Sequence, residues 1–184
     1  ALPISYNALT YHSRGNAYSW KGDYDLAITD YNRAIELKPN EPVIYYNRAD
    51  THFTNNDYDL AIADCCKAVQ LGIQEAGCYY VRGMAYWHKG EYDLAIADYT
   101  KAIELNPDVA AYYHVLAVAY TDKADYDLAI REYDKAIKRN SDDARFFRNR
   151  GYAYFKKGEY ERAIKDLDKA IRRASDDAEA HAIR

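Results

Sequence analysis

The sequence lacks the short motifs by which the common classes of enzyme are recognised. It contains no P-loop, no HExxH zinc motif, no GxSxG nucleophile turn and no cysteine–histidine pair with a third residue to orient it. Its three cysteines, Cys65, Cys66 and Cys78, are odd in number and match no zinc-finger spacing. We expect them to be small buried side chains, with a disulfide from Cys78 to one of the others as the alternative. The sequence therefore favours a protein that is not an enzyme and needs no metal or other cofactor.

Long apolar runs and a strong charge of one sign are also missing. No apolar run is long enough to cross a bilayer and no signal peptide is visible, so we expect no membrane insertion. The 25 basic and 29 acidic residues give a net charge of −4, which disfavours nucleic acid as a partner. We therefore expect a soluble chain, with a cytoplasmic location favoured.

The chain does contain a pattern that returns every 34 residues. The string Tyr-Asp-Leu-Ala-Ile begins at residues 24, 58, 92 and 126, and a looser copy, Tyr-Glu-Arg-Ala-Ile, begins at residue 160. Gly15, Gly83 and Gly151 alternate with Ala49 and Ala117 at the same spacing. A fixed period of this length is typical of stacked repeats, in which each unit touches only its neighbours.

Each repeat is predicted to contain two helices, which makes the fold all-α. In the first repeat we expect helices from about Leu9 to Lys21 and from Asp25 to Leu37. The predicted division of the chain is a lead-in over 1–7, repeats over 8–41, 42–75, 76–109, 110–143 and 144–177, and the start of a further or capping helix over 178–184.

The turn between the two helices has its own signature. Lys21-Gly22 predicts a first helix that ends on a left-handed glycine, and Asn55-Asn56 can adopt the same turn. In the fourth repeat Ala124 replaces the glycine. A left-handed alanine there is expected to cost about 1 kcal/mol.

A small residue between two aromatic rings marks the buried side of each first helix. In the first repeat the three residues are Tyr11, Gly15 and Tyr18, and the small residue facing them on the second helix is Ala27. In the second repeat His52 takes the place of one ring, and we expect a buried histidine with satisfied hydrogen bonds rather than a ligand.

These residues resemble the tetratricopeptide repeat family over residues 8–177. Six positions match its signature in kind and spacing, and they recur in the third repeat; in the first they are Gly15, Tyr18, Ala27, Tyr31, Ala34 and Pro39. The resemblance implies a right-handed α-solenoid of helix-turn-helix repeats whose first helices line a concave groove. It also implies a protein-interaction module, or adaptor, that holds a segment of another protein.

The groove is expected on the face of the first helices opposite the buried side. That face changes from repeat to repeat and is unusually apolar, as surfaces that bind partners often are. The predicted peptide-binding residues are Asn16, Trp20, Val43, Tyr46, Asn47, Phe53, Tyr80, Val81, Met84, Trp87, His114, Val118, Arg145, Arg148 and Asn149.

The partner predicted for this groove is a protein or peptide segment that is apolar with an acidic end. Residues 144–177 carry ten Lys and Arg against six Asp and Glu, so this repeat has a net charge of +4 and could receive the acidic end. The carboxylate clamp known in this family is not expected, because His12, Gly77 and Val81 stand where it has cations. The alternative function is a scaffold that self-associates by stacking its terminal repeats into homo-oligomers.

Overall fold

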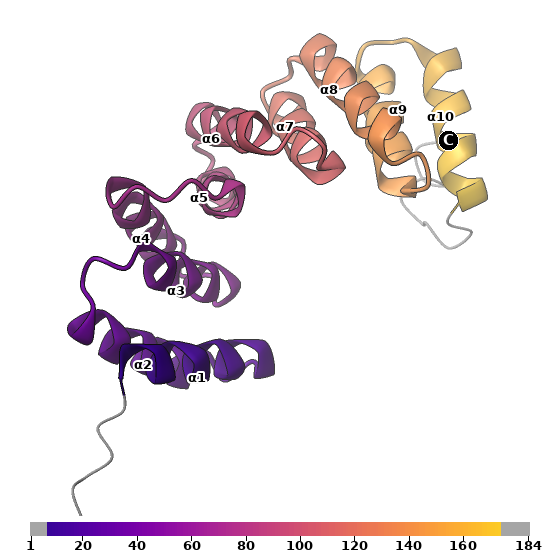
Figure 1. The fold of residues 1–184 in the computed structure, drawn as a ribbon. Coiled ribbons are helices and arrows are strands. Elements are labelled where there is room, and N and C mark those ends of the chain that lie inside the picture. Colours follow the sequence, from indigo (N-terminus) through magenta and orange to yellow (C-terminus); the bar gives the residue numbers. More distant parts are fainter. Residues whose placement is uncertain (1–6, 174–184) are drawn as a thin grey trace, which may run out of the picture. The chain divides into compact units, whose positions relative to one another are not determined.

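The computed structural model describes residues 7–173, and within that range it contains ten helices and no strand (Figure 1). The helices are α1 Ala8–Lys21, α2 Tyr24–Leu37, α3 Pro42–Thr54, α4 Tyr58–Gln70, α5 Ala76–His88, α6 Tyr92–Leu105, α7 Ala110–Asp122, α8 Tyr126–Arg139, α9 Ala144–Lys156 and α10 Tyr160–Arg173. They fit five repeats of two helices each. The predicted capping segment 178–184 and all of the lead-in except Asn7 lie outside the described residues.

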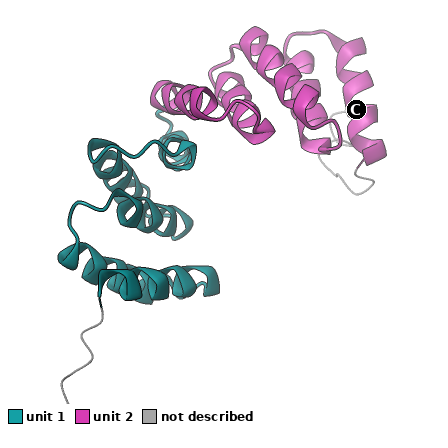
Figure 2. Cartoon of the chain, in the orientation of Figure 1, with its two compact units in different colours: residues 1–91 teal, residues 92–184 magenta. Residues whose placement is uncertain are grey.

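The chain divides into two compact units, residues 1–91 and 92–184 (Figure 2). Unit 1 holds helices α1 to α5 and unit 2 holds α6 to α10. The boundary falls inside the third predicted repeat, between its first and second helix. Each unit is therefore described by itself below.

Within a repeat the two helices approach closely because small residues face each other. Gly15 on α1 is buried, and a Cβ atom placed on it would lie 2.8 Å from the ring of Tyr31 and 3.3 Å from the carbonyl oxygen of Ala27, both on α2. These distances are shorter than side chains tolerate in a packed core. The sequence prediction of a small residue at this contact is confirmed.

A second contact, which was not among the sequence predictions, recurs between the two helices of a repeat. An arginine on the first helix forms two hydrogen bonds to an aspartate 16 residues later on the second helix. The pairs and their distances are Arg14–Asp30 at 2.6 and 2.7 Å, Arg48–Asp64 at 2.7 and 2.6 Å, and Arg150–Asp166 at 2.6 and 2.8 Å. This bidentate geometry is the strongest form of arginine–carboxylate pairing.

The same arginines also connect neighbouring repeats. Arg48 donates to Asn32 on the preceding second helix, α2, and Arg150 donates to Asp134 on α8. Both guanidinium groups are largely buried. Burial opposes the charge of Arg150, but its hydrogen bonds to Asp166 and Asp134 outweigh burial and raise its pKa. One side chain thus fixes its own helix against two others.

Two predictions about single residues need correction. Cys66 is exposed rather than buried, whereas Cys65 and Cys78 are buried as expected, and all three are free thiols. His52 is buried, as expected, but its Nδ1 atom makes no hydrogen bond to any described residue. The prediction that its hydrogen bonds are satisfied is therefore wrong. Burial lowers the pKa of His52, which keeps the ring neutral in the core.

The turns after the first helices are left-handed, as predicted. Gly22 has φ 90° and donates its N–H to the carbonyl oxygen of Ser19 at 3.0 Å. Asn56 has φ 64° and Ala124 has φ 60°, which are the positive values that favour glycine. The expected left-handed alanine is therefore present at residue 124.

Replacing this alanine should stabilise the protein. Ala124→Gly is expected to raise the free energy of unfolding by roughly 0.5–1 kcal/mol, because glycine adopts this φ without a steric penalty. Urea unfolding of the two proteins measures the difference. The control is Ala97→Gly on the exposed side of α6, which should lower stability by about 1 kcal/mol. A loss of stability in Ala124→Gly would contradict this explanation of the turn.

Candidate functional site

The first helices of each unit lie side by side, and an asparagine and a histidine join them. In unit 1 Asn47 on α3 donates its side-chain N–H to Nε2 of His12 on α1 at 2.7 Å. In unit 2 Asn149 on α9 donates in the same way to Nε2 of His114 on α7 at 2.9 Å. Asn47, His114 and Asn149, which were predicted to line the groove, thus help to hold first helices together, as does His12.

In unit 1 this contact extends into a chain of polar groups. Oδ1 of Asn16 accepts a hydrogen bond from Asn47 at 3.1 Å and another from the Tyr31 hydroxyl at 2.8 Å. Burial lowers the pKa of His12, partly offset by Glu41, so the ring stays a neutral acceptor. The chain places the amides of Asn16 and Asn47 in fixed positions on the face of α1 and α3.

Two recesses open on this face of unit 1. One, of about 280 Å³, has a mainly apolar lining that includes Leu9, Val43 and Ile44, and the charged residues Lys38 and Glu41 before α3 also line it. The other, of about 250 Å³, lies further along the two helices and is lined by Asn16, Ser19, Trp20, Tyr31, Asn47 and Asp50. His12 lines the first recess and Asn47 the second, so their hydrogen bond lies between the two.

The side chains most open to a partner are at these recesses. On α1, Trp20 is 94% exposed and Leu9 is 65% exposed. Asp50 also faces the polar recess, although the sequence prediction of contact residues did not include it. Its position seven residues after Val43 on one helix face was the signal available in the sequence.

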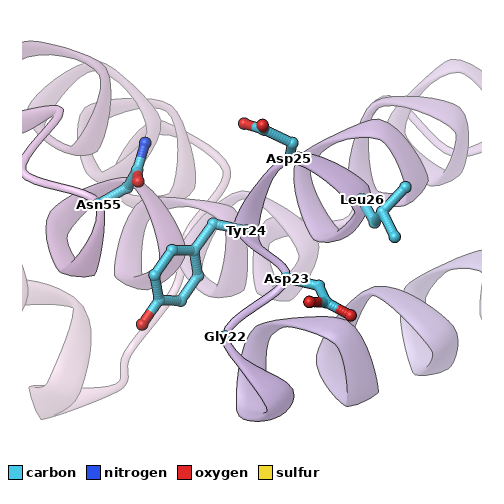
Figure 3. Close-up of a pocket in the computed structure, with 6 residues that line it drawn as sticks. All are labelled: Gly22, Asp23, Tyr24, Asp25, Leu26 and Asn55. Atoms are coloured by element: carbon cyan, nitrogen blue, oxygen red, sulfur yellow. The ribbon is translucent and has the colours of Figure 1, made fainter.

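A further recess, of about 430 Å³, lies at the turn between α1 and α2 (Figure 3). The carboxylates of Asp23 and Asp25 point in different directions there, so they do not converge on one point. A similar recess of about 270 Å³ follows at the next turn, where Lys89 binds Asp59 at 2.5 Å. In the first turn Asn55 stands in place of that lysine. The recess is therefore a repeated feature of the turns, and we do not assign the site to it.

The predicted apolar residues of unit 1 are less open than the sequence suggested. Val81 is only 4% exposed and belongs to the core with Tyr45 and Cys65, so it offers no contact surface. The other predicted apolar residues on α3 and α5 are half-buried: Val43, Tyr46, Phe53, Tyr80, Met84 and Trp87. Exposure of a helix face depends on how its neighbours pack, and the sequence pattern alone does not give it.

Rings cluster where α3 and α5 end. His88 stacks on Tyr58 with 4.7 Å between ring centroids, and Phe53 lies 5.7 Å from His88. Trp87 meets the same histidine edge-on at 4.9 Å. Phe53 and Trp87, both predicted as groove residues, thus contact the same ring, which limits how freely they can move toward a partner.

The predicted residues of unit 2 lie on α7 and α9. Val118 is half-buried against the core of α7 and α8. Arg145 is exposed and pairs with Asp143 at 2.7 Å, while Arg148 donates to Oδ1 of Asn149 at 3.2 Å. The positive charge expected here is present, but it already has partners within the repeat.

His114 has the strongest pKa shift among the histidines of the face. Burial lowers its pKa to about 4, with a further decrease from Arg145 and a smaller one from Arg148, while Asp143 acts in the opposite direction. The neutral ring is the form that accepts the Asn149 hydrogen bond. Protonation therefore competes with the contact between α7 and α9.

The described residues contain no group of three or more His, Cys, Asp or Glu side chains placed to bind a metal ion. Nor does any described helix have the length and apolar character needed to cross a membrane.

Comparison with known proteins identifies the repeats. Models of the tetratricopeptide repeat, also called the TPR repeat, match residues 15–56, 42–71, 76–109 and 114–178. A crystal structure of MamA protein is 29% identical, covers 93% of each chain and has a TM-score of 0.85. A second MamA structure is 30% identical over 89% of this chain and 96% of that one, with a TM-score of 0.84.

A structure of YrrB, described as a TPR protein with an unusual peptide-binding site, is 24% identical. It covers 96% of this chain and 91% of YrrB with a TM-score of 0.84, and at this identity it shows the fold alone. No curated protein matches the chain in sequence. The chain belongs to the tetratricopeptide repeat family, and its all-α fold of helix-turn-helix repeats is confirmed as an α-solenoid.

The buried His114 should make stability depend on pH. Because its pKa falls from the ordinary 6.5 to about 4, the unfolded chain binds more protons between these values. The free energy of unfolding should therefore fall as the pH is lowered through this range, by up to roughly 1.4 kcal/mol per pH unit. His114→Gln, which cannot titrate, should show a shallower fall in urea unfolding at pH 4.5 to 7. Equal slopes in the two proteins would contradict the assignment, since His12 and His52 are present in both.

Proposed function

We propose that the chain is a non-catalytic interaction module that binds a segment of another protein on the first-helix face of unit 1. The observation that carries this proposal is the pair of recesses on α1 and α3, which are lined in part by the exposed side chains of Leu9 and Trp20. Large exposed apolar side chains next to fixed polar groups are typical of binding sites. The peptide-binding site named for YrrB supports this use of the shared fold.

The segment would bind through apolar contacts and a few hydrogen bonds. Leu9 and Val43 offer an apolar recess, and the amides of Asn16 and Asn47 are held in place by their own hydrogen bonds. Fixed groups lose little entropy when a ligand binds, which favours affinity. Tyr46, Tyr80, Met84 and Trp87 would extend the surface along α3 and α5.

Unit 2 would contribute separately to recognition. An acidic group on the partner could bind Arg145 or Arg148, in competition with Asp143 and Asn149. His114, Val118 and Asn149 lie on the same two helices. The proposal therefore keeps the predicted acidic end of the partner and assigns its binding to unit 2.

Self-association is the second candidate function, and exposed residues on α10 favour it. Tyr160 is 56% exposed and Ile164 is 44% exposed on this last described helix. Repeat arrays need a polar terminal face to stay apart in solution. Light scattering separates the two functions: growth of particle mass with concentration favours assembly, whereas a constant monomer mass favours the binding module.

The binding function is tested with peptides selected from a random phage-displayed library on the purified chain. Leu9→Ser with Trp20→Ala should weaken binding of the selected peptides roughly thirtyfold or more, because two exposed apolar contacts are removed and one of them is a tryptophan, a residue type enriched at hot spots. Both residues are exposed, so helicity by circular dichroism should not change. The control is Leu60→Ser with Leu94→Ser, which removes exposed apolar groups from second helices.

Two results would contradict the proposal. One is unchanged affinity in the variant of Leu9 and Trp20. The other is an equal loss in the control variant, which would mean that the peptides bind any exposed apolar surface. A variant with alanine at Tyr80, Met84 and Trp87 tests in the same assay whether the binding surface extends along α5.

A further inference from the structure

The polar recess of unit 1 has an unusual balance of hydrogen-bonding groups. Several donors around it are already used: Asn47 donates to His12 and Asn16, Tyr31 donates to Asn16, and the hydroxyl of Ser19 bonds that of Thr51 at 2.8 Å. The carboxylate of Asp50 has no hydrogen bond or ion pair to any described residue. The recess thus presents a free acceptor that carries a negative charge.

Asp50 is an exposed residue, so a partner can reach its carboxylate. The recess buries part of that carboxylate and raises its pKa, which means that a nearby positive charge would favour the ionised form. The buried aspartates Asp30 and Asp64 in the same unit are each paired with an arginine. None of the six residues that line the recess is a lysine or arginine. A cation from outside the chain would supply the missing partner.

Trp20 provides a second feature that attracts a cation. Its indole lines the same recess and is 94% exposed, so one face of the ring is open to solvent. Tryptophan is the best aromatic partner for ammonium and guanidinium groups, and partial desolvation strengthens the interaction. A flat guanidinium could lie on the ring and still form hydrogen bonds with a carboxylate.

The combination occurs once in the repeated pattern. At 34-residue spacing, the positions equivalent to Asp50 hold Asn16, Met84, Val118 and Tyr152. The positions equivalent to Trp20 hold Thr54, His88, Asp122 and Lys156. Neither residue is needed for the helical hairpin itself, because the other repeats fold without it. A role in binding accounts for both.

We propose that this recess binds the side chain of an arginine or lysine in the partner segment, between the ring of Trp20 and the carboxylate of Asp50. The inference rests on the proposed function and names a chemical requirement of its partner. The partner segment therefore carries a basic residue for unit 1, in addition to any acidic group received by unit 2.

The two recesses also predict a spacing within the segment. Leu9 and Trp20 are 11 positions apart on α1, which corresponds to roughly 16 Å along the helix axis. An extended chain covers this distance in about five residues. A segment bound along α1 should therefore have an apolar residue about five positions from its basic residue.

The test uses the peptides selected on the purified full chain. An arginine of a selected peptide is replaced by citrulline, which removes the charge and keeps the size; a lysine is replaced by acetyl-lysine, which removes the charge but is larger. This change should weaken binding to the wild-type chain roughly tenfold, the effect of a close pair of charges. In Asp50→Asn the same change should have almost no effect. The control is Glu161→Gln, which removes one negative charge from the exposed face of α10.

The outcomes separate this inference from the proposed function. If peptides lose affinity in the variant of Leu9 and Trp20 but are insensitive to Asp50→Asn or to citrulline, the basic-residue site is wrong and the binding module stands. If no peptide is selected, or if binding ignores that variant, the proposed function fails and this inference fails with it. An equal effect of Glu161→Gln would mean that net charge attracts the peptide, which also overturns the site.

Discussion

The buried pairing of arginine with aspartate fixes how the helices of this chain stack. Arg48 binds Asp64 in its own repeat and Asn32 in the repeat before, and Arg150 binds Asp166 and Asp134 in the same way. Burying such charges is costly unless every polar atom finds a partner, so the pair tolerates one arrangement of three helices. The fourth repeat, which has Leu116 in place of the arginine, buries an apolar side chain instead, and Lys135 binds its Glu132.

This arrangement leaves the opposite face of the first helices free to vary. Small residues and arginines hold the two helices of a repeat together, so most side chains on the other face can differ between repeats. Val81 and Val118 are exceptions, because they pack against the core. In unit 1 they form an apolar recess and a polar one, separated by a histidine–asparagine contact. Residues that recur in the repeats thus build the frame, and residues that differ between repeats would recognise the partner.

Much of the frame can be read from the sequence, because it repeats. The 34-residue spacing predicts the helices, and the Lys-Ala sequence at 123 and 124 correctly predicts a left-handed alanine. The arginine–aspartate spacing of 16 was equally visible but is not a local pattern, so its meaning appears only when two helices are in contact. The burial of Val81 and the isolation of Asp50 depend on neighbouring helices and could not be predicted from one helix face.

The central claim, that the buried pair fixes the stacking, is tested most directly by a double-mutant cycle on Arg150 and Asp166. Unfolding in urea is measured for Arg150→Met, Asp166→Leu and the double variant. Each single change leaves a buried charge without its partner and should cost roughly 3 kcal/mol, whereas the double variant should cost much less than the sum. Additive losses would contradict the account, because the two side chains would then act independently.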